Sequence, residues 1–188
     1  TIISAHRAAK QNRTREAEDS LRSLTHLMPW DWHLWKELGW VQFAAGQDDA
    51  SIASFARAQQ LNPNDPALWI YPGRIHSRRG EAQRGIDLLE HAHKLAPSDP
   101  EPLIEYLTVL LRHGELARAL DVARDFLAIH PTITSRILTL LLEWVDNVHA
   151  LAVVIPEDSH AQRQYISILM DQHADAAAIP YIEKLIAP

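Results

Sequence analysis

The chain has 188 residues, of which 47% are hydrophobic and 22% charged, and its formal net charge at pH 7 is −6. This balance is typical of a folded protein rather than a disordered one, and the acidic net charge argues against nucleic-acid binding. Because the chain has no cysteine, disulfides, thiolate catalysis and cysteine-based zinc sites are excluded. The longest largely apolar runs, residues 137–142 and 151–155, are far shorter than the ~20 residues of a membrane-spanning helix, so no direct membrane insertion is expected.

Residues 1–31 predict two helices before the first proline-containing turn. Residues 1–10 fit a short helix, and residues 15–27 fit a longer one with Leu21 and Leu24 on its apolar side. We expect residues 1–31 to be a partial repeat, in which the second helix is complete and the first is shortened. Since the chain begins with Thr1 and no signal sequence follows, it is either a mature product or an excised fragment, and we favour a fragment.

From Pro29 to Pro131 the sequence repeats itself at a fixed interval, without insertion or deletion. Three residue types keep a step of 34 residues: Pro29, Pro63, Pro97 and Pro131; Gly46, Gly80 and Gly114; Asp31, Asp65 and Asp99. Each aspartate can accept hydrogen bonds from the first-turn amides of a helix, and each glycine can end that helix in a left-handed conformation. Small residues (Ser51, Gly85 and Ala119) fit where two helices approach most closely. The pattern predicts regular helical pairs at 32–65, 66–99 and 100–133.

After Pro131 the pattern becomes irregular. Pro156 follows Pro131 by 25 residues instead of 34, so the second helix of this unit, near residues 149–155, must be about two turns shorter. A final unit is expected from Pro156, with Asp158 or Ser159 as the helix cap and helices near 161–171 and 174–187. Pro180 should bend or interrupt the last helix. We interpret residues 134–188 as two divergent repeats, so that residues 1–188 form a single domain.

The 34-residue period and its residue pattern resemble the tetratricopeptide repeat, a helix-turn-helix unit that stacks into a right-handed superhelix. The resemblance implies an all-α solenoid of antiparallel helix pairs, with about 10–12 helices in a chain of this length. It also implies a non-enzymatic scaffold for protein–protein interaction. We therefore expect no catalytic residues, no cofactor and no bound metal.

In this family the first helix of every unit lines a concave groove. Numbering each unit from residue 32, 66 or 100, the groove stripe takes the second, fifth, ninth, twelfth and thirteenth residues. The candidate partner-binding residues are His33, Lys36, Trp40, Phe43, Arg74, Ser77, Arg78, Thr108, Leu111 and Arg112. This stripe is basic and aromatic, so a protein or peptide partner with acidic groups is expected. The alternative is that Trp40 packs in the interior and the arginines are merely solvated.

Other sites have weaker support. Domains of this family that grip chaperone tails use a Lys and an Asn one turn apart; Lys36 matches the Lys, but Trp40 replaces the Asn, which argues against that role. The 11 histidines show no metal-ligand spacing, and no catalytic motif stands out. The cluster of Trp30, Trp32 and Trp35 could be a carbohydrate platform, but packing at the junction with the preceding unit explains it better.

A second hypothesis comes from the tail. Residues 142–187 resemble the divergent terminal repeats that follow the membrane part of some O-antigen ligase or polymerase-like proteins. This resemblance implies the soluble, periplasmic repeat region of a larger bacterial membrane protein for polysaccharide or lipid-linked sugar assembly. Membrane-spanning sequence immediately upstream would favour it over a free-standing scaffold. The compartment, cytoplasmic or periplasmic, stays open, and the apolar ends of the array could support self-association.

Overall fold

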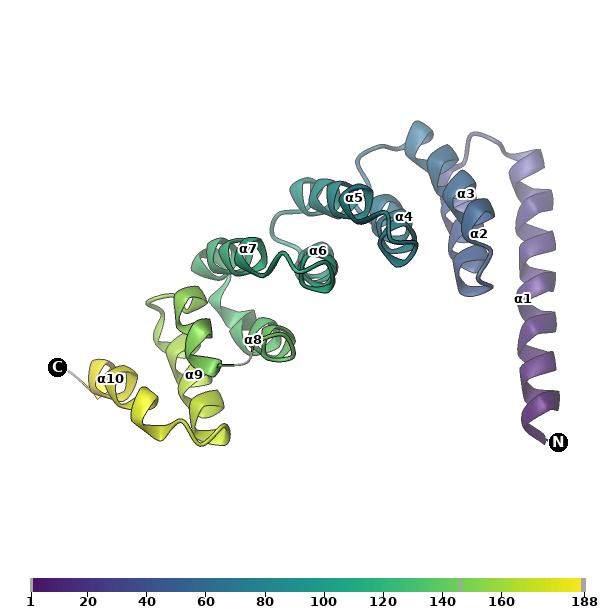
Figure 1. Ribbon diagram of the computed structural model, residues 1–188. Coiled ribbons are helices and arrows are strands. Elements are labelled where there is room, and N and C mark those ends of the chain that lie inside the picture. The colour runs from purple at the N-terminus through teal and green to yellow at the C-terminus, as the bar shows by residue number, and fades with distance from the viewer. Residues whose placement is uncertain (1, 146, 187–188) are drawn as a thin grey trace. The chain divides into compact units, whose positions relative to one another are not determined.

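The computed structural model describes residues 2–145 and 147–186, with side chains from residue 13 onward, and these residues are all-helical (Figure 1). The first helices are α1 (Ile2–Leu27), α2 (Trp32–Ala44), α3 (Asp48–Leu61), α4 (Ala67–Arg78) and α5 (Ala82–Leu95). They are followed by α6 (Pro100–Arg112), α7 (Leu116–Ile129), the 3-10 helix η1 (Pro131–Ile133), α8 (Thr134–Leu142), the 3-10 helix η2 (Val148–Val154), α9 (Ser159–Asp171) and α10 (Asp175–Ile186). The described residues contain no strand, as predicted for an all-α fold.

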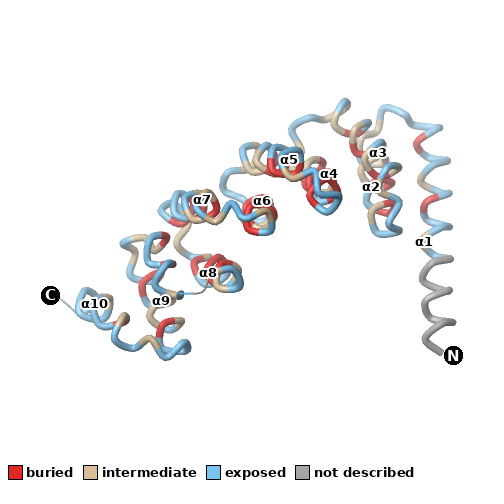
Figure 2. Tube along the Cα trace, viewed as in Figure 1, coloured by how far each residue is buried: buried red, intermediate tan, exposed pale blue. Residues whose placement is uncertain are grey.

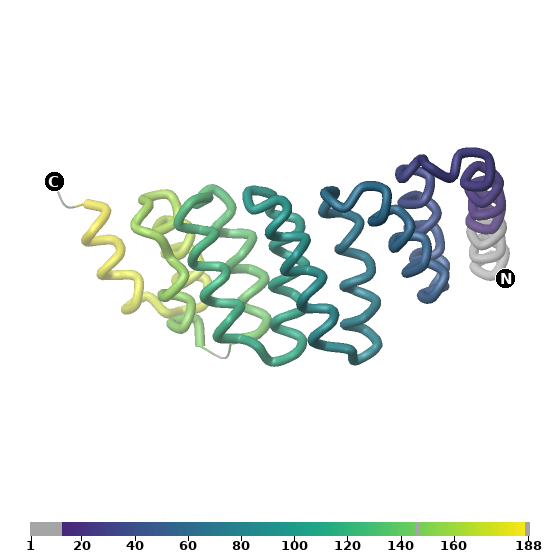
Figure 3. The backbone as a smooth tube through the Cα atoms, turned by 90° about the horizontal axis from the view of Figure 1, so that it is seen from above, coloured from purple at the N-terminus to yellow at the C-terminus, as the bar shows by residue number. Residues whose placement is uncertain are grey.

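The chain divides into two compact units, Thr1–Pro97 and Ser98–Pro188. The first unit holds α1 to α5, and its helices lie side by side (Figure 3). The second unit holds α6 to α10 together with the two 3-10 helices. The predicted single domain spanning residues 1–188 stays a prediction.

Aspartates begin the first helices, as the sequence predicted. The carboxylates of Asp31, Asp65 and Asp99 each accept a hydrogen bond from the backbone amide two residues later, at 2.9 to 3.0 Å. In the last unit Asp158, rather than Ser159, takes this position and accepts from two amides, both at 2.9 Å. These bonds satisfy first-turn amides that have no partner within the helix.

A left-handed residue ends the first helix of each regular pair. Gly46, Gly80 and Gly114 have φ values of 76, 81 and 80°. His173 has φ 56° and takes the equivalent place in the last unit, because it follows Pro156 at the distance at which Gly46 follows Pro29. A side chain disfavours this backbone conformation, which is why the sequence pattern did not reveal the position.

The two helices of each regular pair meet at small residues. The Ser51 hydroxyl donates to the carbonyl of Gly39 at 2.8 Å, which ties α3 to α2. Gly85 lies so close to α4 that a Cβ atom there would be 2.9 Å from backbone atoms. Ala119 is fully buried at the same position in α7. Burial is dense on α4 and α6, the first helices of the second and third pairs (Figure 2).

The N-terminal segment differs from the prediction of two helices. Residues 2–27 form one helix of 26 residues, because the segment between the two expected helices contains no glycine or proline to end the first. Its buried carboxylate, Glu18, accepts hydrogen bonds from Gln47 at 2.9 Å and Gln42 at 3.4 Å. Glu18 and Thr25 precede Ile52 and Gln59 by one period, so in sequence register α1 corresponds to a second helix. That residues 1–31 form a partial repeat stays a prediction.

The C-terminal half shows the irregularity that the sequence predicted. The seven-residue 3-10 helix η2 stands where a full second helix would follow α8. Pro180 does not interrupt α10, which runs on to Ile186. The carbonyl of Ala176, which loses its helical partner to the proline, lies on the exposed side of the helix, where solvent can satisfy it.

Candidate functional site

Five predicted groove residues form a surface on the first unit, where α2 and α4 contact each other. We call this surface the α2–α4 face; it consists of Lys36, Trp40, Phe43, Arg74 and Arg78. Trp40 is 48% exposed, so the alternative that it packs in the interior is wrong. An exposed indole one helical turn from Phe43 on α2 is a suitable anchor for a partner side chain.

The centre of the face is a cluster of aromatic rings and guanidinium groups. The ring of Phe43 meets Tyr71 edge-on at 5.1 Å, and Tyr71 stacks on the buried Phe55 at 5.4 Å. The Arg74 guanidinium lies 5.3 Å from the Phe43 ring and 6.0 Å from the Tyr71 ring. Arg78 approaches Phe43 from 5.3 Å. Both cations are therefore held against an aromatic surface, which orients them at low cost in side-chain entropy.

Tyr71 was missed by the sequence reasoning. It directly follows Ile70, the fifth residue of its repeat, and therefore lies one position off the groove stripe. Ile70 is in fact buried, whereas Tyr71 is half-buried and places its ring beside Phe43. An aromatic residue next to the stripe was the available signal.

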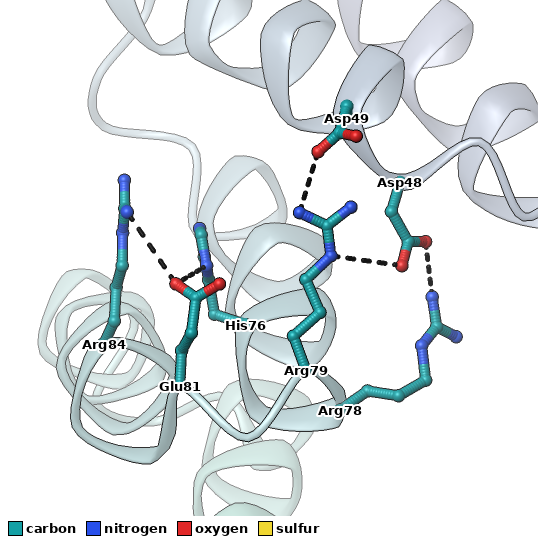
Figure 4. A network of polar contacts seen from close by, with 7 residues as sticks. All are labelled: Asp48, Asp49, His76, Arg78, Arg79, Glu81 and Arg84. Carbon is teal, nitrogen blue, oxygen red and sulfur yellow. Dashed lines mark hydrogen bonds and ion pairs between the residues drawn. The ribbon is translucent and has the colours of Figure 1, made fainter.

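The cations of the face are already engaged by carboxylates of the same unit. Arg78 pairs with Asp48 at 2.5 Å, and Lys36 lies 3.6 Å from Asp65 (Figure 4 shows Arg78 and Asp48). Arg79 bridges Asp48 at 3.5 Å and Asp49 at 2.8 Å, and these hydrogen bonds and charges raise the pKa of Arg79. The face is consequently less basic than a count of its lysine and arginine residues indicates.

A second polar group lies beside this network. The buried His76 has its Nδ1 2.8 Å from the Glu81 carboxylate, and Arg84 lies 3.8 Å from the same carboxylate (Figure 4). His76 is not part of the α2–α4 face. Its contact with Glu81 joins the end of α4 to the beginning of α5. Its role in this arrangement is to fix the α4–α5 turn.

Several predicted groove residues lie elsewhere. Ser77 is only 3% exposed, because it faces Gly85 of α5, so including it among the contact residues was wrong. Leu111, like Ser77 the twelfth residue of its repeat, is also buried, in the second unit. Thr108 is half-buried, and its hydroxyl donates to the carbonyl of Ile104 at 2.7 Å. Arg112 is exposed in the last turn of α6.

His33 is exposed at the beginning of α2 and stacks on Trp32 with ring centroids 3.6 Å apart. Lys36 lies 5.0 Å above the same indole. The Trp35 indole donates to the carbonyl of Pro29 at 3.1 Å, and one period later Trp69 donates to Pro63 at 3.0 Å. This repeated bond favours a structural role for the tryptophan cluster over a carbohydrate platform.

Other chemistry finds no support among the described residues. They contain no group of three or more histidine, aspartate or glutamate side chains that could hold a metal ion. Nor does any of their helices combine the length and the apolar character that crossing a membrane requires. What remains is a set of helix pairs with one exposed aromatic and cationic surface in the first unit, the architecture of a helical repeat protein.

Comparison with known proteins identifies the repeat. Residues 4–66 match the family model described as tetratricopeptide repeat. A tetratricopeptide repeat protein from Parabacteroides merdae ATCC 43184 is similar in structure, with a TM-score of 0.63 at 15% identity over 98% of this chain and 77% of that one. MamA 41-end from Desulfovibrio magneticus RS-1 has a TM-score of 0.56 at 12% identity, over 96% and 88%. Another crystal structure of MamA gives 0.60 at 14%, over 96% and 91%.

A comparison with curated protein sequences found no match. The family match supports the tetratricopeptide repeat interpretation over residues 4–66, and the structural likeness confirms the all-α helical-repeat fold. At these identities the solved structures inform on the fold alone. The resemblance of residues 142–187 to polysaccharide-assembly proteins, and the periplasmic alternative that it implies, stay predictions.

Proposed function

We propose that the chain is a non-catalytic scaffold that binds a peptide segment of a partner protein on the α2–α4 face. The observation that carries the proposal is the exposed Trp40 on the same surface as the Phe43 ring, against which Arg74 and Arg78 are held. The match of residues 4–66 to the tetratricopeptide repeat supports a protein-interaction role, and the family resemblance implies contact residues on first helices such as α2 and α4.

The aromatic residues supply most of the binding energy in this proposal. A large apolar side chain of the partner covers Trp40 and the edge of Phe43, which removes apolar surface from water. Buried tryptophan anchors at interfaces typically contribute 2 kcal/mol or more when truncated, which is roughly a 30-fold change in affinity. An aliphatic or aromatic residue in the partner segment is therefore required.

The arginines supply selectivity for an acidic group. A carboxylate that approaches Arg78 must compete with Asp48, and one that approaches Lys36 must compete with Asp65. Arg74 is held over two rings, and a partner carboxylate can accept two parallel hydrogen bonds from its guanidinium group. The expected ligand carries one acidic residue close to one large apolar residue.

For the second unit by itself, we propose Thr108 and Arg112 as contact residues. They take the ninth and thirteenth positions of their repeat, as Arg74 and Arg78 do one period earlier. The buried Ser77 and Leu111 act as support behind the surface rather than as contacts.

The test uses peptides selected from a displayed library on the full chain and then measured by fluorescence anisotropy. Trp40→Ala should weaken the selected peptides roughly 30-fold and Arg74→Glu at least about tenfold. Matched controls are Trp144→Ala, an exposed tryptophan outside the stripe, and Arg163→Glu on α9. Controls should bind normally, and all four variants should keep the native helical circular dichroism. Equal losses in variants and controls, or selected peptides indifferent to Trp40, would refute the proposal.

A further inference from the structure

Asp48, the first residue of α3, bridges two arginines at the end of α4. Its Oδ1 accepts a hydrogen bond from the Arg78 guanidinium, and its Oδ2 lies 3.5 Å from Nε of Arg79 (Figure 4). Arg79 also pairs with Asp49 at 2.8 Å. The Asp48 side chain is 19% exposed, whereas the Arg78 side chain is 52% exposed. A partner can therefore reach the arginine of this pair more readily than the carboxylate.

The repeat itself does not require a carboxylate at this position. One period after Asp48 the chain has Ala82, and two periods after it the chain has Leu116. The capping aspartates, such as Asp31, recur in every regular unit because each first helix needs a partner for its first-turn amides. Asp48 is thus an addition to the repeat pattern, and it is paired with Arg78, a residue of the α2–α4 face.

Both members of the pair keep a favourable environment when they separate. The Arg78 guanidinium lies 5.3 Å from the Phe43 ring, which holds it on the face without using its hydrogen bonds. Asp48 keeps Arg79, and it lies in the first turn of α3, where the helix dipole favours a negative charge. Since neither charge is left isolated, an incoming carboxylate can replace Asp48 at Arg78.

We propose that Asp48 is a specificity-determining residue, which occupies Arg78 until a peptide anchored at Trp40 brings its own carboxylate there; this inference rests on the proposed function of the α2–α4 face. A carboxylate of the same unit has a high effective concentration at Arg78, so a free anion does not displace it. A peptide held at Trp40 presents its carboxylate at a comparable effective concentration. Asp48 thereby disfavours partners that carry negative charge but no apolar anchor.

Two substitutions remove the competing carboxylate. Asp48→Asn keeps the size of the side chain, and Asp48→Ala supplies the residue that the repeat has at Ala82. For an acidic peptide selected on the full chain, fluorescence anisotropy should show roughly two- to fivefold tighter binding to both variants, the value of an exposed ion pair. The same peptide with its acid changed to the amide should bind the variants and the wild type equally. Asp49→Asn is the matched control, because it makes the same change in net charge at the next residue, which pairs with Arg79 rather than with Arg78.

A measurement without peptide tests the pair itself. Phenylglyoxal modifies guanidinium groups, and tandem mass spectrometry of proteolytic fragments locates the modified arginine. In the full chain, Arg78 should react roughly two- to fivefold faster in Asp48→Asn than in the wild type, because the ion pair that holds its charge is lost. Asp49→Asn should leave the rate at Arg78 unchanged. All variants should keep the native helical circular dichroism.

The outcomes separate this inference from the proposed function. Unchanged peptide affinity or unchanged Arg78 reactivity in Asp48→Asn overturns the role of Asp48, and so do equal gains in Asp49→Asn. If Trp40→Ala still weakens the peptide in that case, the α2–α4 face binds peptide and only the inference about Asp48 fails. If Trp40→Ala has no effect, the proposed function fails, and the role of Asp48 fails with it.

Discussion

Substitution of Gly85 by alanine should destabilise the first unit, although alanine normally favours a helix. A Cβ atom at this position would lie 2.9 Å from the carbonyl oxygen of Gly73, 2.9 Å from the amide nitrogen of Ser77 and 3.0 Å from the Ser77 Cβ. Two of these three atoms belong to the backbone of α4 and cannot rotate away. The clash can be relieved only if α4 and α5 move apart.

The size of the effect follows from two opposing contributions. Gly→Ala inside a helix stabilises it by about 1 kcal/mol, whereas overpacking costs about 1–3 kcal/mol and should be at the upper end against backbone. The expected net loss is about 1–2 kcal/mol in the free energy of unfolding. For a chain of this size, each kcal/mol lowers Tm by about 2–4 °C.

Thermal and urea unfolding, followed by circular dichroism at 222 nm, measure the loss. Asp87→Ala is the control, because Asp87 is exposed on the same helix and its loss should change the unfolding free energy by less than about 0.5 kcal/mol. If Gly85→Ala unfolds at the wild-type temperature or above, the two helices are not in close contact at this point, and the packing argument fails.

Three further predictions concern pH. Burial, and to a smaller degree the charge of Tyr181, raises the pKa of Tyr165 to about 12. The stability that protonated Tyr165 contributes should be complete below pH 10 and be lost between pH 10 and about 12. Tyr165→Phe should remove the last tyrosinate absorbance step near 295 nm. Burial raises the pKa of Glu18, but hydrogen bonds from two glutamines and an arginine outweigh burial and lower the pKa below 4.5. The stability that Glu18 adds above pH 4.5 should therefore be lost on acidification, and Glu18→Gln should flatten the change of Tm with pH below 4.5. Burial lowers the pKa of His93 below 6.5, so its neutral form stabilises the fold above pH 6.5, and this contribution to stability falls as the pH drops below that value. His93→Leu introduces the residue found one period later at Leu127 and should remove this pH-dependent change in stability. An unchanged pH dependence would contradict the assignment to His93.

The regular repeats could be predicted because local contacts specify them. An aspartate cap such as Asp31 and a left-handed Gly46 act within one turn of their own position, so a sequence pattern reveals them directly. His173 takes the same left-handed conformation without the residue that announces it. There the surrounding packing overrides the local preference, and only the distance from Pro156 indicates the position.

The candidate site was harder to predict, because its properties depend on residues from neighbouring helices. The charge of Arg78 is balanced by Asp48, which lies 30 residues away in sequence. Ser77 and Phe43 hold equivalent positions in successive repeats, but Ser77 is buried against Gly85, whereas Phe43 reaches the surface beside Tyr71. The stripe rule locates a helical face, and the size of each side chain then decides what is exposed on it.

The hydrogen bonds that join α1 to the rest of the first unit affect the order in which the helices separate. Repeats that pack through Phe55 and Leu68 separate only when apolar surface is exposed to water. In α1, by contrast, Glu18 is hydrogen-bonded to Gln42 and Gln47, and water can replace these hydrogen bonds. Amide hydrogens of α1 near Glu18 should therefore exchange with solvent well before those of α3. We therefore expect α1 to detach first, which would uncover the outer surface of α2 while the repeats behind it stay folded.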